Sequence, residues 1–100
     1  MVHTVNKSPF EKNSLKACLD HATKGSSILF IEDGIYGALK GTTYSDSVSN
    51  VMNDVKVFVL GSDLKARGMS EDSILDGIEI VDYSGFVELT VKHDVVQSWL

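Results

Sequence analysis

The segment VKVFVL, residues 55–60, decides the fold of this chain. It is almost continuously apolar and rich in β-branched residues, and the turn-forming residues Gly61, Ser62 and Asp63 follow it directly. A similar run, ILFI, occupies residues 28–31. Strands without a polar face are covered on both sides, as in a parallel sheet with helices above and below. The two runs therefore predict buried neighbouring strands.

Two shorter apolar runs, VHTV at residues 2–5 and IEIV at residues 78–81, extend the pattern. The connections between successive runs are roughly 20 residues long, which suits crossover helices and is too long for hairpins. We therefore expect an α/β, three-layer fold with a mostly parallel, four- to five-stranded sheet and helices on both faces. At 100 residues with 43% hydrophobic content, the chain fits a single domain over residues 1–100.

Composition limits the cellular setting and the partners. A single cysteine excludes an intrachain disulfide and favours the reducing cytoplasm. No apolar run approaches the roughly 20 residues of a membrane span, and the N-terminus lacks a signal-peptide pattern. We therefore expect no membrane partner. The net charge of −5, without a dense lysine or arginine cluster, argues against direct binding to nucleic acid.

The clearest helix-start signal lies at residues 8–11, SPFE, where Ser8 precedes Glu11 by three residues and Pro9 occupies the first helical position. Gly25 supplies a stop signal. We therefore expect a first helix over roughly residues 9–23. Its apolar stripe would comprise Phe10, Leu15, Cys18, Leu19 and Ala22.

Periodicity leaves residues 83–93 open between helix and strand. Val87, Leu89 and Val91 alternate with polar residues, whereas Ser84 could cap a helix. The tail at residues 95–100 is a candidate fifth strand. Trp99, near the end of this tail, allows two interpretations. It packs on its own domain, or it serves as an anchor in a subunit interface.

In a parallel sheet, ligands bind at the carboxyl ends of the strands. The loops expected there are residues 6–8, 32–34, 61–63 and 82–85, all small and polar. They contain neither GxGxxG nor GxxxxGK[ST], so no nucleotide or flavin cofactor is expected. The three histidines and one cysteine lack metal-site spacing, so no metal is expected. A domain that binds a small ligand through these loops remains a possible function.

Cys18 is the residue with the most distinctive chemistry. It is the sole thiol, and His21 lies three residues further along the predicted helix, where a protonated imidazole would favour the thiolate. Its place on the apolar stripe supports the opposite interpretation, a small buried hydrophobe. Residue spacing leaves both interpretations open.

The sequence also resembles a known family. VHTVNKSPFE at residues 2–11, IEDGIY at 31–36, VLGSDLKARG at 59–68, VDYSGFVELT at 81–90 and QSWL at 97–100 are together similar to the DsrH/TusB family. These segments run in order from one end of the chain to the other. The resemblance implies a flavodoxin-like, DsrEFH-like subunit and favours a helix over residues 83–93.

The resemblance further implies a cytoplasmic sulfur-relay complex, a heterohexamer with DsrE/TusD-like and DsrF/TusC-like subunits. Such complexes pass persulfide sulfur to a DsrC/TusE-like carrier, in sulfur oxidation or in 2-thiolation of the tRNA wobble uridine. A DsrH-type chain carries a cysteine in its first helix, and Cys18 occupies that place. Cys18 is thus a candidate persulfide-carrying thiol of a sulfurtransferase subunit, with His21 as a possible thiolate stabiliser.

The rival hypothesis is a non-catalytic interaction subunit that holds its DsrE- and DsrF-type partners and docks the carrier. The principal persulfide cysteine of these complexes is assigned to the DsrE/TusD-type subunit, which is a different chain. Isolated, the present chain could also form a homo-oligomer.

Overall fold

A computed structural model of the chain describes residues 1–93 and 96–99. Its centre is one five-stranded sheet in the order β4-β3-β2-β1-β5, with every neighbouring pair parallel. The strands are β1 (Val2–Val5), β2 (Ser27–Phe30), β3 (Lys56–Leu60), β4 (Glu79–Val81) and β5 (Val96–Trp99). The predicted parallel α/β architecture is confirmed.

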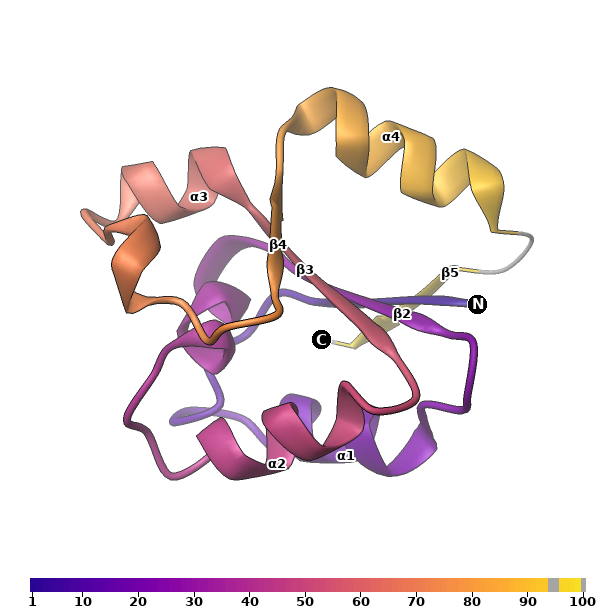
Figure 1. Ribbon diagram of the computed structural model, residues 1–100, viewed down its shortest axis with the longest axis horizontal. Coiled ribbons are helices and arrows are strands. Elements are labelled where there is room, and N and C mark those ends of the chain that lie inside the picture. Colours follow the sequence, from indigo (N-terminus) through magenta and orange to yellow (C-terminus); the bar gives the residue numbers. More distant parts are fainter. Residues whose placement is uncertain (94–95, 100) are drawn as a thin grey trace.

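Helical segments connect the strands. They are α1 (Ser14–His21), the 3₁₀ segment η1 (Glu32–Ala38), α2 (Ser45–Val51), α3 (Gly61–Ala66), the 3₁₀ segment η2 (Glu71–Ser73) and α4 (Tyr83–Lys92). Figure 1 shows α1 and α2 on one side of the sheet and α4 on the other. The sheet is therefore the middle of three layers, as the two apolar runs predicted.

The core is built on the face covered by α1 and α2. Side chains from β2 and β3 that point to this face pack with Leu15 of α1, Val48 of α2 and Leu64 of α3. All four residues of β2 are buried because both of its faces are covered. Within the described residues, no helix is long and apolar enough to cross a membrane.

Helix α4 resolves the ambiguity at residues 83–93 in favour of a helix. The carboxylate of Asp82 accepts a hydrogen bond from the backbone N–H of Gly85 at 2.8 Å and caps the first turn. A parallel sheet needs a crossover between β4 and β5, and α4 supplies it. β5 confirms the candidate fifth strand at Val96–Trp99, while residues 95 and 100 lie outside the described residues.

The first helix is shorter than predicted. It begins at Ser14, whereas the sequence signal placed its start at Pro9. The Ser8 hydroxyl accepts a hydrogen bond from Phe10 N at 3.2 Å, and the Ser8 carbonyl accepts from Glu11 N, so residues 8–12 form a turn. Phe10 is 59% exposed and lies outside the helix stripe. The capping-box prediction was wrong because Ser8 instead closes this local turn.

Candidate functional site

The thiol of Cys18 is buried inside the domain. Its side chain lies on the inward face of α1 with 0% exposure, within the cluster that includes Leu15 and Val48. Burial raises the pKa of this thiol to about 12, because the apolar surroundings disfavour the charged form. At neutral pH the group is a protonated, enclosed thiol. Since the thiolate is the reactive species, this geometry does not support nucleophilic chemistry at Cys18.

The contacts of the His21 ring are with groups other than this thiol. Its ring Nδ1 lies 2.8 Å from the carbonyl oxygen of Ala17, one turn back on α1, and its ring centroid lies 5.5 Å from that of Trp99. The side chain is exposed, whereas the Cys18 thiol faces the core. The three-residue spacing predicted that the two side chains would lie close together on α1. In the structure the Cys18 side chain is buried and the His21 side chain is exposed.

Trp99 packs on its own domain through a contact that sequence reasoning missed. The indole Nε1–H donates a hydrogen bond to Nδ1 of His3 at 3.1 Å, joining β5 to β1 across 96 residues. An indole is only a donor, so Nδ1 of His3 must be unprotonated. His3 is 2% exposed, and burial together with the nearby N-terminal amine and His21 lowers its pKa. The contact therefore exists with neutral His3.

This contact predicts a pH-dependent stability. The folded-state pKa of His3 lies below its ordinary value of 6.5, so the unfolded chain binds the proton first as the pH falls. The contribution of His3 to the free energy of unfolding should be complete above about pH 6.5. It should decrease as the pH falls from about 6.5 toward the folded-state pKa. Urea titrations followed by Trp99 fluorescence would measure this. In His3→Gln, which retains an acceptor, this component should disappear; an unchanged pH profile would contradict the assignment.

At the carboxyl edge of the sheet, three of the predicted loops meet in one polar network. Arg67 Nε donates to Asp33 Oδ1 at 2.9 Å, and its guanidinium also lies near Asp63, at 3.8 Å. The second carboxylate oxygen of Asp63 accepts the backbone N–H of Glu32 at 2.7 Å. Asn6 reaches the Glu32 carboxylate at 3.5 Å. These loops bind one another and close this part of the edge.

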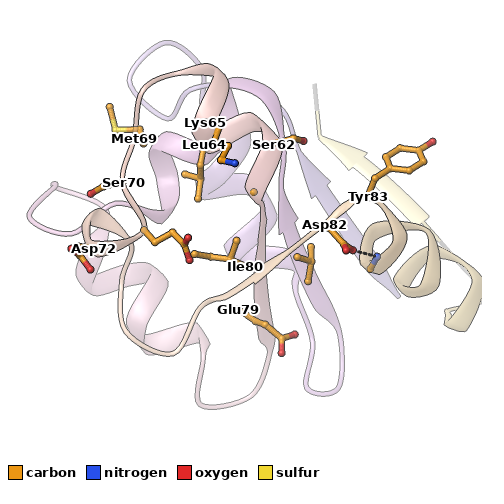
Figure 2. A pocket seen from close by; sticks show the side chains of 14 residues that line it. Ser62, Leu64, Lys65, Met69, Ser70, Asp72, Glu79, Ile80, Asp82 and Tyr83 are labelled. Atoms are coloured by element: carbon orange, nitrogen blue, oxygen red, sulfur yellow. Dashed lines mark hydrogen bonds between the residues drawn. The ribbon is translucent and has the colours of Figure 1, made fainter.

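The remaining predicted loop, residues 82–85 after β4, borders an open groove together with Gly61 and Ser62 of the loop after β3. We define the β4 groove by the residues that line it, which are Gly61, Ser62, Leu64, Lys65, Met69–Asp72, Glu79–Tyr83 and Gly85. Its volume is about 1010 Å³. Figure 2 shows Leu64 and Lys65 on one side of the hollow and Ile80 of β4 on the other.

The β4 groove lies where the chain changes sides of the sheet. After β3, Leu64 of α3 packs into the core cluster that contains Leu15 of α1 and Val48 of α2. Helix α4 follows β4 and lies across the sheet from α1 and α2 (Figure 1). Adjacent parallel strands whose following segments diverge in this way leave a crevice at their carboxyl ends, and open α/β sheets bind ligands there. The groove has polar and charged side chains but no thiol, since Cys18 is the sole cysteine.

The described residues contain no group of three or more histidine, cysteine, aspartate or glutamate side chains that could hold a metal ion. Both the groove and the closed network lie apart from Cys18, which is enclosed beneath α1.

Comparison with known proteins now gives the family. The sequence pattern of the family described as "DsrH like protein" matches residues 7–96. The chain is 37% identical to Protein TusB of Shigella flexneri and 36% identical to Protein TusB of Escherichia coli K12, covering 99% of this chain and 100% of each relative. The chain belongs to the DsrH/TusB family.

Solved structures with low sequence identity share the fold of this DsrH/TusB-family chain. It superposes on the ychN protein of E. coli with a TM-score of 0.79 at 18% identity, covering 97% of both chains. It also superposes on MTH1491 of Methanobacterium thermoautotrophicum, a protein of unknown function, with a TM-score of 0.76 at 17% identity. That alignment covers 97% of this chain and 96% of the other. These likenesses confirm the fold.

Proposed function

We propose that this DsrH/TusB-family chain is an interaction subunit of a cytoplasmic sulfur-relay complex and that it does not carry the sulfur itself. The proposed partners are TusC/DsrF-like and TusD/DsrE-like subunits in a heterohexamer, with a TusE/DsrC-like carrier as the acceptor of sulfur. The relatives named above are TusB proteins, which supports the branch leading to tRNA 2-thiolation over sulfur oxidation. The acidic charge of the chain supports contact with proteins, not with the tRNA.

The outer face of α4 is the observation that carries this proposal. Tyr83, Val87 and Val91 follow one another at intervals of four residues, so they form a row along the helix. They are 70%, 42% and 80% exposed. On its other side α4 carries Phe86 and Leu89, which are partly buried. A helix that is apolar on both faces is normally buried on both.

Two more exposed apolar residues lie beyond the C-terminal end of α4, where the N-terminal amine is 3.3 Å from Nδ1 of His93. Val96 on edge strand β5 is 45% exposed and Met1 is 46% exposed. Contiguous exposed apolar surface marks interaction sites in soluble proteins, because its burial against a partner removes it from water. We assign this surface, the α4 row with its flanking residues, to contact with a sister subunit.

The enclosed thiol supports the same proposal against its rival. Transfer of sulfane sulfur between persulfides requires a thiolate that a second sulfur can reach. Cys18 has neither property, since its side chain is 0% exposed and its pKa is raised to about 12. In this proposal Cys18 serves as a packing group between α1 and the sheet.

Replacement of Cys18 tests the division of roles. In a complex reconstituted with Cys18→Ala, the rate of sulfur transfer to the carrier should stay within about twofold of the wild-type rate, because no step passes through this thiol. The variant should lose stability, by about 1–2 kcal/mol, since a small buried group is removed. Thermal unfolding of the isolated subunit would measure that loss.

Two further measurements make the test decisive. In the native subunit, a thiol reagent should modify Cys18 at least about 100-fold more slowly than in the urea-unfolded chain, since reaction requires opening of the core. After persulfide treatment of the native complex, intact mass should show no sulfur added to this chain. Added sulfur that is absent in Cys18→Ala, with slowed transfer, would overturn the proposal in favour of a relay role.

A further inference from the structure

The β4 groove follows the free edge of the sheet. Within the described part of the chain, β4 pairs only with β3, so its other side has no strand partner. Glu79, Ile80 and Val81 are consecutive, and all three line the groove. Successive residues of a strand point to opposite faces of the sheet, so a groove lined by all three runs along the backbone edge. Alternate residues of such an edge strand direct backbone N–H and C=O groups outward.

Apolar side chains form part of the groove beside this edge. Leu64 and Met69 contribute from α3 and the turn after it, and Ile80 contributes from β4. Pockets next to an unpaired strand suit an extended peptide, whose backbone pairs with the edge while alternate side chains enter the pockets. A segment of five extended residues spans about 17 Å, which fits along a molecule whose principal dimensions are 32 × 28 × 24 Å.

The groove has a strongly acidic lining. Its acidic residues are Glu71, Asp72, Glu79 and Asp82, and its one basic residue is Lys65. Potentials across protein interfaces are complementary, so this lining selects a positively charged occupant and disfavours an acidic one.

We propose that the β4 groove binds an extended segment of a partner protein, bearing lysine or arginine and apolar side chains, as an added parallel or antiparallel strand on β4. The apolar row on α4 contacts a sister subunit in the proposed function, and the present inference does not depend on it. Val87 and Val91 lie outside the groove lining, so the two surfaces can be altered separately.

A titration of the full-length, ¹⁵N-labelled chain with the doubly capped peptide Lys-Val-Lys-Val-Lys tests this proposal. We expect saturable amide shifts centred on Glu79–Val81 and slower hydrogen exchange at the outward-facing amides of β4. The variant Glu71→Lys/Glu79→Lys should weaken binding at least about 10-fold, because two attractive charges become repulsive. Both residues are exposed, so the variant should keep the fold.

Matched probes separate strand addition from simple charge attraction. Asp20→Lys/Asp54→Lys makes the same charge change at exposed positions outside the groove and should bind within about twofold of wild type. A second peptide of the same charge has N-methyl groups on alternate backbone nitrogens, those on the edge that would pair with β4. It should bind at least about 10-fold more weakly than the unmethylated peptide. Spermine, a cation without peptide groups, should not produce the β4 shifts.

Three results would overturn the inference. Peptide binding that is unchanged by Glu71→Lys/Glu79→Lys would remove the groove as the site. Equal binding by the methylated peptide or spermine would reduce the effect to charge alone. Shifts spread evenly over the acidic surface, or absent altogether, would show that β4 does not accept an added strand. None of these results bears on the α4 row, whose test is assembly with the sister subunits.

Discussion

Placing arginine at both Val87 and Val91 should abolish assembly of the chain with the proposed TusC- and TusD-like subunits while leaving the isolated subunit folded. The two side chains are 42% and 80% exposed in the free chain. Burying a valine in an interface contributes about 1.5 kcal/mol or more, and an unpaired guanidinium there adds a desolvation cost. We expect at least about a 100-fold loss of affinity, or about 2.7 kcal/mol. Co-purification and analytical ultracentrifugation of the co-expressed subunits would measure it.

The isolated Val87→Arg/Val91→Arg subunit should unfold within about 1 kcal/mol of wild type, since exposed helix positions tolerate arginine. Ser47→Arg/Ser49→Arg is the matched control, because it adds the same charge at exposed positions on α2. That control should assemble normally. If the α4 variant assembles with wild-type affinity, the α4 row is not the subunit contact and the central observation of the proposed function fails.

Gly34→Ala should be the most damaging small substitution in the chain. A Cβ at this position would lie 1.9 Å from the carbonyl oxygen of Val5 and 2.7 Å from its carbonyl carbon. Both contacts are with the backbone of β1, which cannot rotate away. We expect a loss of about 3 kcal/mol or more of unfolding free energy, at the upper end of the cost of overpacking. Chemical denaturation of the isolated variant would measure it.

Gly41→Ala provides the control for this prediction. Gly41 has φ +71°, and nothing lies within 4 Å of a Cβ built there, so alanine adds backbone strain but no collision. That strain should cost about 1–2 kcal/mol. If Gly34→Ala loses no more stability than Gly41→Ala, the C-terminal end of β1 can move to make room for the Cβ. That result would contradict the tight packing of η1 against β1.

The two proposed surfaces adjoin one another at the start of α4. Tyr83 lines the β4 groove and also begins the exposed apolar row along α4. Asp82, which caps α4, belongs to the groove as well. A partner segment seated on β4 would therefore lie next to a subunit bound to α4. Val87 and Val91 lie outside the groove lining. Arginine at these two positions therefore tests the α4 row without altering the β4 groove.

The order of the elements could be read from local patterns. The apolar runs gave β1 to β4 because a buried parallel strand needs several adjacent apolar residues, and the polar turns gave their carboxyl ends. The start of α1 could not be read in this way. The spacing of Ser8 and Glu11 is compatible with a capping box and also with a turn. The structure forms the turn through hydrogen bonds at Ser8, which the residue pattern does not specify.

The candidate site was only partly accessible to the same reasoning. The carboxyl-edge loops were predicted correctly as a set, because parallel strands bring them to one side. Which loops would close on each other and which would border a groove depended on Arg67, whose guanidinium joins Asp33 and Asp63. The tryptophan near the end of β5 gave a signal of burial, but its partner His3 is 96 residues away.

The sequence by itself determined the layered α/β fold, the family and the presence of a lone thiol in the first helix, because these follow from patterns within short segments. Only the tertiary structure decided that Cys18 faces the core, that His21 faces Trp99, and that an acidic groove remains open beside β4. The physical reason is that burial and electrostatic environment depend on contacts between segments distant in sequence. Helical spacing places two residues near each other on a helix but does not state which face the sheet will cover.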